Sequence, residues 1–265
     1  MITSTKNQKT KNLSALIKKG KARNEKGLFV VEGIKMYEEA PPSRIKDIYV
    51  SESFFNNYAD KGRITSLNYE ILKDEVFNYV SDTKTPQGVM CLVDQYNYTF
   101  EEIVNVENPL LVLADDIKDP GNLGTIIRTA EGAGVNGIII SRQSVDIYNP
   151  KTIRSTMGSI YRMPFVYVED LSQAILKLKE LNITTYAAYL NNSNDYCEKN
   201  YKKGTAFVIG NESHGVSKEH IAIIDEMIKI PMFGEVESLN AAVACSILMY
   251  EAARQRRGSG PGVDK

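Results

Sequence analysis

Residues 119–128 read DPGNLGTIIR, and this stretch decides the fold together with two later ones. The second stretch, 207–215, reads FVIGNESHG, and the third joins 228–232 (IKIPM) to 237–244 (ESLNAAVA). Each sets a short apolar run beside Gly, Asn or Ser residues, which leave backbone amides and carbonyls free for a ligand. In parallel α/β sheets, ligands bind at the carboxyl ends of the strands. The three stretches therefore predict a ligand site built from strand ends.

The apolar runs around these stretches predict a mostly parallel sheet flanked by helices. Strands are expected at 110–114, 135–140, 183–189, 206–209 and 227–230, and helices at 123–132, 150–157, 171–181, 217–224 and 239–256. Such continuous apolar runs are typical of parallel strands that are buried on both faces. Residues 132–137 match the dinucleotide pattern GxGxxG but follow a helix and precede a strand. Because a nucleotide site needs the opposite order, this match is interpreted as a helix cap and turn.

The first hundred residues predict a separate small α/β domain. Strands are expected at 28–31, 48–50 and 88–93, and helices at 34–40, 52–58 and 69–79. The polar stretch 94–109 ends in Asn108-Pro109 and is interpreted as a linker.

Composition limits the class of protein. The 265 residues are 43% hydrophobic and 25% charged, which is typical of a two-domain protein with a sizeable core. No apolar run approaches the ~20 residues of a membrane helix, and the N-terminal stretch lacks a signal-peptide core. Three widely spaced cysteines fit the reducing cytoplasm, and two histidines are too few for a local metal cluster or a Ser-His-Asp site. We expect a cytoplasmic protein without a membrane segment or a metal.

The net charge of -1 conceals a basic N-terminal segment. Residues 1–26 hold eight Lys and Arg residues against one acidic residue, Glu25. The cluster can attract phosphates, or it can be the solvated face of an amphipathic helix whose buried face carries Leu13, Leu16 and Ile17. Charge alone does not separate these two interpretations. The candidate phosphate contacts are Lys9, Lys11, Lys18, Lys19 and Arg23.

The three stretches offer polar side chains at expected strand ends. Asn122 is expected to cap a helix, and Arg128 lies about 120° further round that helix, so the two need not share a face. Glu212 can accept hydrogen bonds, whereas the neighbouring His214 is interpreted as a loop residue or a phosphate contact. Ser238 or Asn240 is expected to cap the last helix. The small residues 241–244 suit close packing of that helix against a cofactor loop or a second subunit.

In order and spacing, the three stretches resemble the SpoU (TrmH-type) branch of the SPOUT RNA 2′-O-ribose methyltransferases. The resemblance covers 108–257, and 149–151 with 155–159 look like the linking segment of that family. The N-terminal sequences 29–33 (FVVEG) and 86–89 (PQGV) resemble its L30e-like substrate-binding domain. The resemblance implies an α/β protein: an L30e-like RNA-binding domain at 1–100, a trefoil-knotted parallel-sheet catalytic domain at 108–257 and a flexible tail at 258–265.

The resemblance also implies the chemistry. Such enzymes transfer a methyl group from S-adenosylmethionine to a ribose 2′-hydroxyl and work as homodimers whose site borrows from both subunits. The implied polar site is Arg128, Asn122, Glu212, Ser238 and Asn240, and the implied cofactor site is Leu190, Gly210, Asn211, Ile230 and Leu239. A guanidinium stays charged in proteins, so Arg128 is expected to stabilise the developing alkoxide or hold a phosphate.

Ribosomal RNA is the expected substrate. Three alternatives stay open: a transfer RNA 2′-O-methyltransferase, a non-catalytic RNA-binding protein that kept the fold, and a SPOUT branch that methylates a base nitrogen. The intact polar residues argue against the second alternative. The Asn211-Glu212 pair and the 238–240 triplet argue against the third.

Overall fold

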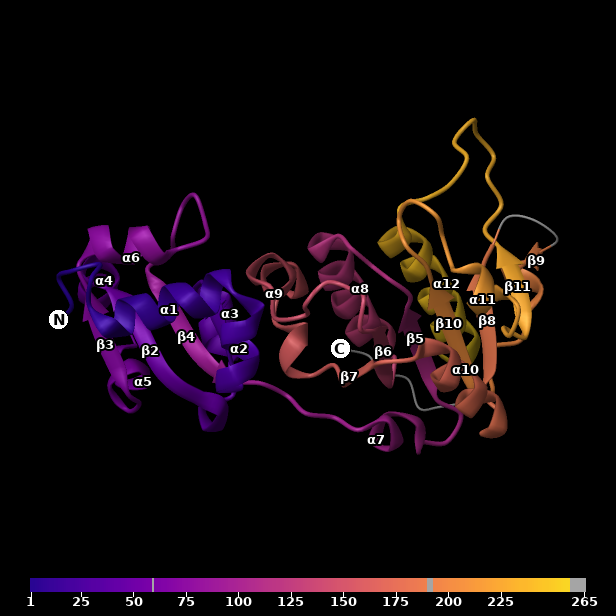
Figure 1. Ribbon diagram of the computed structural model, residues 1–265, viewed down its shortest axis with the longest axis horizontal. Coiled ribbons are helices and arrows are strands. Elements are labelled where there is room, and N and C mark those ends of the chain that lie inside the picture. The colour runs from indigo at the N-terminus through magenta and orange to yellow at the C-terminus, as the bar shows by residue number, and fades with distance from the viewer. Residues whose placement is uncertain (59, 190–192, 258–265) are drawn as a thin grey trace. The chain divides into compact units, whose positions relative to one another are not determined.

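The computed structural model describes residues 1–58, 60–189 and 193–257, which form two compact units (Figure 1). Unit 1 comprises Met1–Tyr96 and Asp146–Tyr161, and unit 2 comprises Asn97–Val145 and Arg162–Lys265. The division differs from the expected 108–257 domain, because 146–161 groups with unit 1. The expected tail at 258–265 lies outside the described residues.

Unit 1 is built on a four-stranded sheet in the order β1-β4-β2-β3. Its strands are β1 (Leu28–Glu32), β2 (Ile45–Ser51), β3 (Tyr69–Leu72) and β4 (Val89–Asp94). Pairs β1/β4 and β2/β4 are antiparallel, and β2/β3 is parallel. Its helices are α1 (Gln8–Lys18), α2 (Gly20–Lys26), α3 (Ile34–Glu39), α4 (Glu52–Asn57), α5 (Lys61–Thr65), α6 (Asp74–Val80) and α9 (Pro150–Thr156), with short 3-10 turns η1 (Pro42–Arg44) and η2 (Ser159–Tyr161).

Helix α1 is amphipathic, as the spacing of its apolar residues indicated. Leu13, Leu16 and Ile17 lie on one side of the helix and are buried in the unit 1 core, while Asn7 caps its first turn. The expected helix at 69–79 was wrong in its first part. Residues Tyr69–Leu72 pair with β2 because Tyr and Ile suit a pleated, half-buried surface, and the helix begins only at Asp74.

Unit 2 is built on a seven-stranded sheet in the order β7-β6-β5-β10-β8-β11-β9, and all its neighbouring strands are parallel. The strands are β5 (Leu110–Ala114), β6 (Gly137–Ser141), β7 (Phe165–Val168), β8 (Thr184–Ala188), β9 (Asn194–Asp195), β10 (Thr205–Ile209) and β11 (Glu226–Lys229). The helices are α7 (Phe100–Val104), α8 (Pro120–Ala133), α10 (Leu171–Glu180), α11 (Lys218–Ile221) and α12 (Ala241–Arg256), with one 3-10 turn, η3 (Tyr196–Glu198). Strands β7 and β9 and helix α7 were not predicted from the sequence; α7 lies within the expected linker, where Thr99 and Glu102 form a capping box.

Helices cover both faces of this sheet. Helices α7 and α10 share one core cluster with alternate residues of β5 and β10. Helix α12 packs on the other face of β10 and against α8 (Figure 1). The GxGxxG segment is a turn, as expected: α8 ends at Ala133, Gly134 adopts the left-handed conformation at φ 74°, and β6 begins at Gly137.

The strand order places a switch point between β5 and β10. From β5 the chain continues to β6 on one side, and from β10 it continues to β11 on the other side. A crevice forms at the carboxyl ends of two adjacent strands whose connections leave in opposite directions. The first two sequence stretches, 119–128 and 207–215, lie directly at this point. Among the described residues, no helix is long and apolar enough to cross a membrane.

Candidate active site

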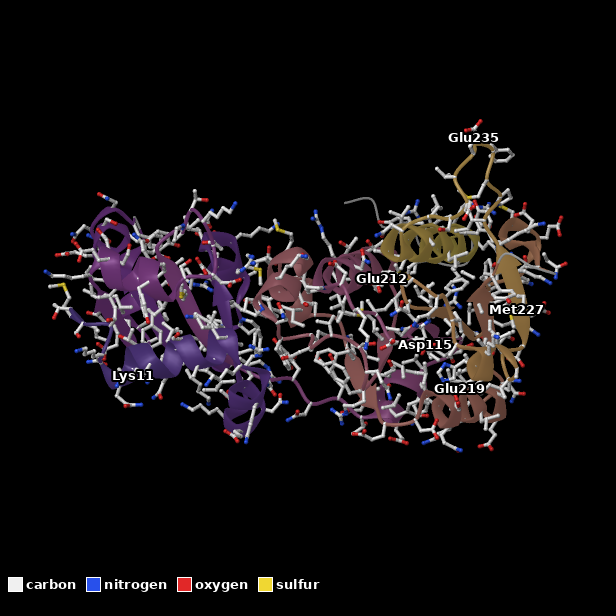
Figure 2. All side chains as sticks on the ribbon, turned by 45° about the horizontal axis from the view of Figure 1, so that its top comes forward. Lys11, Asp115, Glu212, Glu219, Met227 and Glu235 are labelled. Atoms are coloured by element: carbon white, nitrogen blue, oxygen red, sulfur yellow. The ribbon has the colours of Figure 1, made fainter. Side chains whose placement is uncertain are left out.

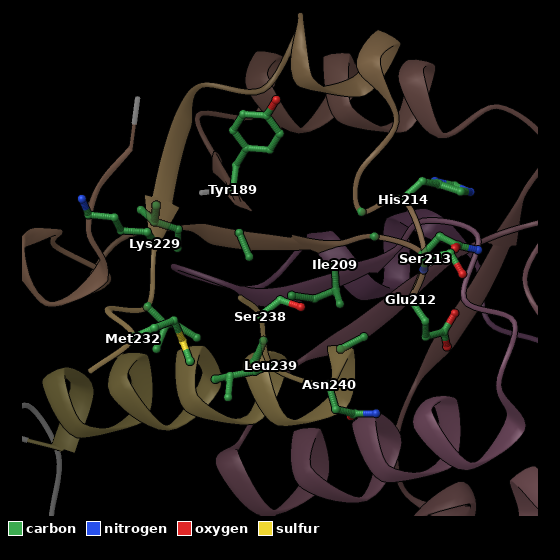
Figure 3. Close-up of a pocket in the computed structure, with 18 residues that line it drawn as sticks. Tyr189, Ile209, Glu212, Ser213, His214, Lys229, Met232, Ser238, Leu239 and Asn240 are labelled. Carbon is green, nitrogen blue, oxygen red and sulfur yellow. Dashed lines mark hydrogen bonds between the residues drawn. The ribbon is translucent and has the colours of Figure 1, made fainter. Parts of the chain in front are cut away.

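A pocket of about 560 Å³ lies at the carboxyl edge of the unit 2 sheet (Figure 3). Its walls come from the ends of β8, β10 and β11, the segments that follow β10 and β11, and the first residues of α12. Ile209, Ile230, Met232 and Leu239 supply apolar surface. The volume lies within the roughly 300–1,000 Å³ typical of small-molecule sites.

Seven residues singled out from the sequence line this pocket. They are Gly210, Asn211, Glu212, Ile230, Ser238, Leu239 and Asn240. Leu190, the expected further wall, lies outside the described residues. Pocket residues that the sequence analysis did not select include Tyr189, Lys229 and Met232. Tyr189 and Lys229 stand at the carboxyl ends of β8 and β11, so strand-end position is the signal that could have found them.

Position 210 requires glycine because the backbone of the same loop passes very close to it. A Cβ atom at this position would lie 2.0 Å from the backbone nitrogen of Val216 and 2.1 Å from the carbonyl carbon of Gly215. The loop closes on itself here, because the amides and carbonyls of Asn211 and Gly215 exchange hydrogen bonds of 3.1 and 2.9 Å. Gly210 also lines the pocket, so the same missing side chain lets the loop return past it and leaves its backbone beside the pocket.

Glu212 connects the β10 loop to the segment after β5. Its Oε1 accepts hydrogen bonds from Asn122 Nδ2 at 2.8 Å and from the backbone N–H of Asp119 at 3.1 Å. Its Oε2 accepts from the backbone N–H of Lys118 at 3.2 Å. Burial by itself would raise the pKa of Glu212, but these hydrogen bonds outweigh it and hold the pKa below its ordinary value of 4.5. Glu212 is therefore an ionised acceptor at neutral pH.

Asn122 does not cap its helix, which corrects the expectation from the sequence. Helix α8 begins at Pro120, and the side chain of Asp119 caps it by accepting from the backbone N–H of Asn122 at 2.9 Å. The Asn122 side chain bridges two loops instead. It donates to Glu212, and its Oδ1 accepts from Asn240 Nδ2 at 2.9 Å.

Asn240 caps α12, as expected. Its Oδ1 accepts from the backbone N–H groups of Ala242 and Val243 at 2.9 and 3.3 Å. The amide orientations in this network follow from charge. An ionised Glu212 can only accept, so the Asn122 NH₂ faces it; the Asn122 oxygen then requires the Asn240 NH₂, which leaves the Asn240 oxygen for the helix. One carboxylate thus sets the direction of two amides and joins the segments that follow β5, β10 and β11.

Asn211 makes a second connection between the segments that follow β5 and β10. Its Nδ2 donates to the backbone oxygen of Asp116 at 2.9 Å, and its Oδ1 accepts from the backbone N–H of Ser213 at 2.8 Å. Asp116 has a positive φ of 59° and forms an ion pair with Lys118 at 2.5 Å. His214 is exposed on the pocket rim, with Nε2 3.9 Å from the Asp116 carboxylate.

Arg128 and Ala244 occupy different surfaces. Arg128 is exposed on α8, does not line the pocket and makes no hydrogen bond or ion pair with another described residue. Ala244 lines the pocket, so the small residues of α12 pack beside the pocket wall. Val243 and Tyr250 on the same helix are each 47% exposed.

The basic N-terminal residues divide into two groups. Arg23 is buried, and its guanidinium donates to Asp146 and to the carbonyls of Leu16 and Ile17. It is therefore a structural residue of unit 1, which corrects its assignment as a phosphate contact. Lys9 forms an ion pair with Glu70. The other three candidates, Lys11, Lys18 and Lys19, are exposed, and Figure 2 marks Lys11 on α1.

Two family models and a curated relative match this chain. The model of the SpoU rRNA Methylase family matches residues 109–250, and that of the MRM3-like substrate binding domain matches residues 7–91. The 23S rRNA (guanosine(2553)-2′-O)-methyltransferase RlmP of Bacillus subtilis is 34% identical over 94% of this chain and 97% of its own length.

Solved structures share the fold of this chain. The SpoU methyltransferase AviRb from Streptomyces viridochromogenes, in complex with AdoMet, aligns with a TM-score of 0.84 at 26% identity, over 96% of this chain and 100% of its own. An AdoMet-bound rRNA methyltransferase from Sinorhizobium meliloti aligns with a TM-score of 0.83 at 30% identity, over 96% of this chain and 97% of its own.

Proposed function

Because this chain belongs to the SpoU rRNA methylase family, we propose that it transfers a methyl group from S-adenosylmethionine to a ribose 2′-hydroxyl of RNA, and of ribosomal RNA in particular. The observation that carries the proposal is the pocket at the carboxyl ends of β8, β10 and β11, together with the network in which the pocket residues Glu212 and Asn240 bond to Asn122. The B. subtilis relative, which acts on 23S rRNA, favours rRNA over transfer RNA.

The pocket residues fit S-adenosylmethionine. Apolar side chains of Ile209, Ile230 and Leu239 offer a surface for the adenine ring. Backbone groups around Gly210 and Ile230 can bind the polar atoms of the ribose and of the amino acid part, since loops at strand ends leave such groups exposed. When bound, the cofactor supplies a sulfonium methyl group that is already activated for transfer.

The contribution of the protein is alignment and electrostatics. The network of Glu212, Asn122 and Asn240 holds three loops in one geometry, so we assign these residues a positioning role. Ser238 lines the pocket with an exposed side chain, where its hydroxyl can contact the RNA ribose. A permanently charged Arg128 would stabilise the alkoxide that forms as the 2′-hydroxyl loses its proton, or hold the adjacent phosphate.

The position of Arg128 supports a homodimer. On α8 and α12, which pack together, Arg128, Val243 and Tyr250 are all exposed, so this surface combines a free cation with apolar area. We infer that this face binds a second copy of the chain and brings Arg128 to the pocket of the partner. Exposed apolar area of this kind marks interaction surfaces. We further propose that unit 2 is a trefoil knot, as the resemblance to the SPOUT enzymes implies; the place of β10 between β5 and β8, both of which precede it in the chain, is an order that a knotted chain can adopt.

We propose that unit 1 binds the RNA. Lys and Arg outnumber Asp and Glu by 17 to 13 in unit 1 but are outnumbered 15 to 20 in unit 2. Lys11 and Lys18 extend from α1, and Lys18 lies 5.8 Å from the ring centre of the exposed Tyr79. A cation beside an exposed aromatic ring suits contact with a phosphate and a neighbouring base. Three free cysteines fit a cytoplasmic location.

Tritiated methyl transfer tests the proposal. The purified protein is incubated with labelled cofactor and with rRNA or transfer RNA that lacks the modification, and the RNA is then hydrolysed with alkali. We expect label in alkali-resistant dinucleotides from rRNA, because 2′-O-methylation blocks cleavage at that position. Label on a base would refute the ribose assignment, label in transfer RNA alone would refute the substrate, and cofactor binding without transfer would indicate a non-catalytic RNA-binding protein.

A further inference from the structure

A buried His–Asp pair lies below the pocket loop, and the chemistry proposed above does not use it. His220 of α11 and Asp115, directly after β5, each have a side chain that is 7% exposed. His220 Nδ1 lies 2.8 Å from Asp115 Oδ2. Figure 2 marks Asp115 in the interior of unit 2 and the neighbouring Glu219 at its surface, where Glu219 Oε1 is 3.9 Å from His220 Nε2. A buried carboxylate without a partner is costly, so this pair restrains both segments that carry it.

Asp115 also holds the residue that starts α11. The backbone N–H of Ser217 donates to Asp115 Oδ2 at 3.1 Å. The Ser217 hydroxyl caps the helix by accepting from the backbone N–H of His220 at 3.4 Å. One carboxylate oxygen therefore accepts from both ends of the first turn of α11 and attaches that turn to the end of β5.

The pocket loop 210–215 lies between two such attachments. At the N-terminal end of the loop, Asn211 and Glu212 bond to Asp116 and to the backbone of Lys118 and Asp119. At the C-terminal end of the loop, the chain returns past Gly210 to Val216 and then enters the turn that Asp115 and His220 hold. Residues 212–215 are themselves exposed, so the loop contributes few buried contacts of its own. Its geometry depends on these two attachments.

We propose that the buried His220–Asp115 pair positions the 210–215 loop for the cofactor; this inference rests on the proposed function of the pocket. Neither residue lines the pocket, so the pair acts through the loop. A loop that adopts the binding geometry about one-tenth of the time binds its ligand about tenfold more weakly. Loss of the pair thus weakens cofactor binding while the methyl-transfer step at saturating cofactor is retained.

Three variants of the full chain test the pair. His220→Leu removes the donor, whereas His220→Asn retains it, because the Asn amide nitrogen stands close to the position of the imidazole Nδ1. Thr185→Val is the matched control. It removes a partly buried hydrogen bond to a carboxylate in unit 2, from the buried Thr185 Oγ1 to Asp225 at 2.7 Å, at the opposite end of β8 from the pocket.

Cofactor affinity is measured by calorimetry with S-adenosylhomocysteine, together with thermal unfolding and hydrogen exchange of the free protein. We expect the dissociation constant to rise about tenfold in His220→Leu, to return to within about threefold of wild type in His220→Asn and to stay unchanged in Thr185→Val. Exchange in the free His220→Leu protein should accelerate at 211–221 alone, that is, in the loop and in the α11 turn that the pair holds. Wild-type affinity in His220→Leu would overturn the inference.

The exchange measurement separates this inference from the proposed function. If the wild-type protein binds no cofactor, the proposed function fails. Faster exchange confined to 211–221 in His220→Leu, reversed in His220→Asn, would still support the positioning role. Acceleration spread over all of unit 2 would overturn it, because the pair would then be an ordinary core contact.

Discussion

Alanine at Gly210 tests the geometry of the pocket most directly. Its Cβ atom would lie 2.0 Å from Val216 N, whereas ordinary contacts begin at 3.4 Å, so the two backbone segments must separate by about 1.4 Å. Separation of this size breaks the two hydrogen bonds between Asn211 and Gly215, each of which contributes about 1 kcal/mol. Overpacking adds about 1–3 kcal/mol.

The expected total is about 3–5 kcal/mol, divided between stability and cofactor binding. If half of it falls on binding, the cofactor dissociation constant rises about ten- to seventyfold, since each 1.4 kcal/mol is a factor of ten. Calorimetry with S-adenosylhomocysteine measures the loss of affinity, and urea unfolding measures the loss of stability.

Two other glycines provide controls for this variant. Gly234 has no atom within 4 Å of its Cβ position, so Gly234→Ala should change neither quantity. Gly215 also has open space but a φ of +71°, so Gly215→Ala should destabilise by roughly 1 kcal/mol without a clash. If Gly210→Ala bound the cofactor as tightly as Gly234→Ala and unfolded at the same urea concentration, the close approach at Gly210 would not determine the pocket.

Four further predictions follow from the site and the surfaces. Arg128→Ala should lower turnover about 100-fold and leave cofactor affinity unchanged, and Arg142→Ala, which removes another exposed arginine, is the control. Joint loss of affinity and turnover would contradict the assignment of Arg128 to the RNA and not to the cofactor. Tyr250→Glu should give a folded monomer that is inactive on RNA, and sedimentation as an active dimer would exclude the α8/α12 face. Lys11→Glu should reduce the salt slope of RNA binding by at least about one unit, and an unchanged slope would remove Lys11 from the RNA contact. Folding lowers the pKa of Glu212, so its ionised form stabilises the protein above its ordinary pKa of 4.5, and this stabilisation is lost as the pH falls below that value. The difference in unfolding free energy between wild type and Glu212→Gln should therefore shrink from pH 6 to pH 3. A difference that stays constant over this range would contradict the network.

Local pattern was sufficient for much of the fold. The buried strands of unit 2 were predicted because continuous apolar runs have few other stable placements than a sheet covered on both faces. The Asn240 cap and the turn at Gly134 were predicted because each depends on the conformation of a few adjacent residues. Residues Tyr69–Leu72 were wrongly predicted as helix, because a run this short is consistent with either periodicity until a partner strand is present.

The sequence by itself determined that three polar stretches end three parallel strands, and with that the edge of the sheet where the pocket lies. Only the tertiary structure decided what the side chains do there. It placed β10 between β5 and β8, so that Glu212 reaches Asn122, 90 residues away, and Asn122 becomes a bridge between loops while Asp119 takes the cap. It also buried Arg23 against Asp146, 123 residues away. Periodicity and capping act over one or two turns of chain, whereas the partner of a charge is chosen by which strands become neighbours.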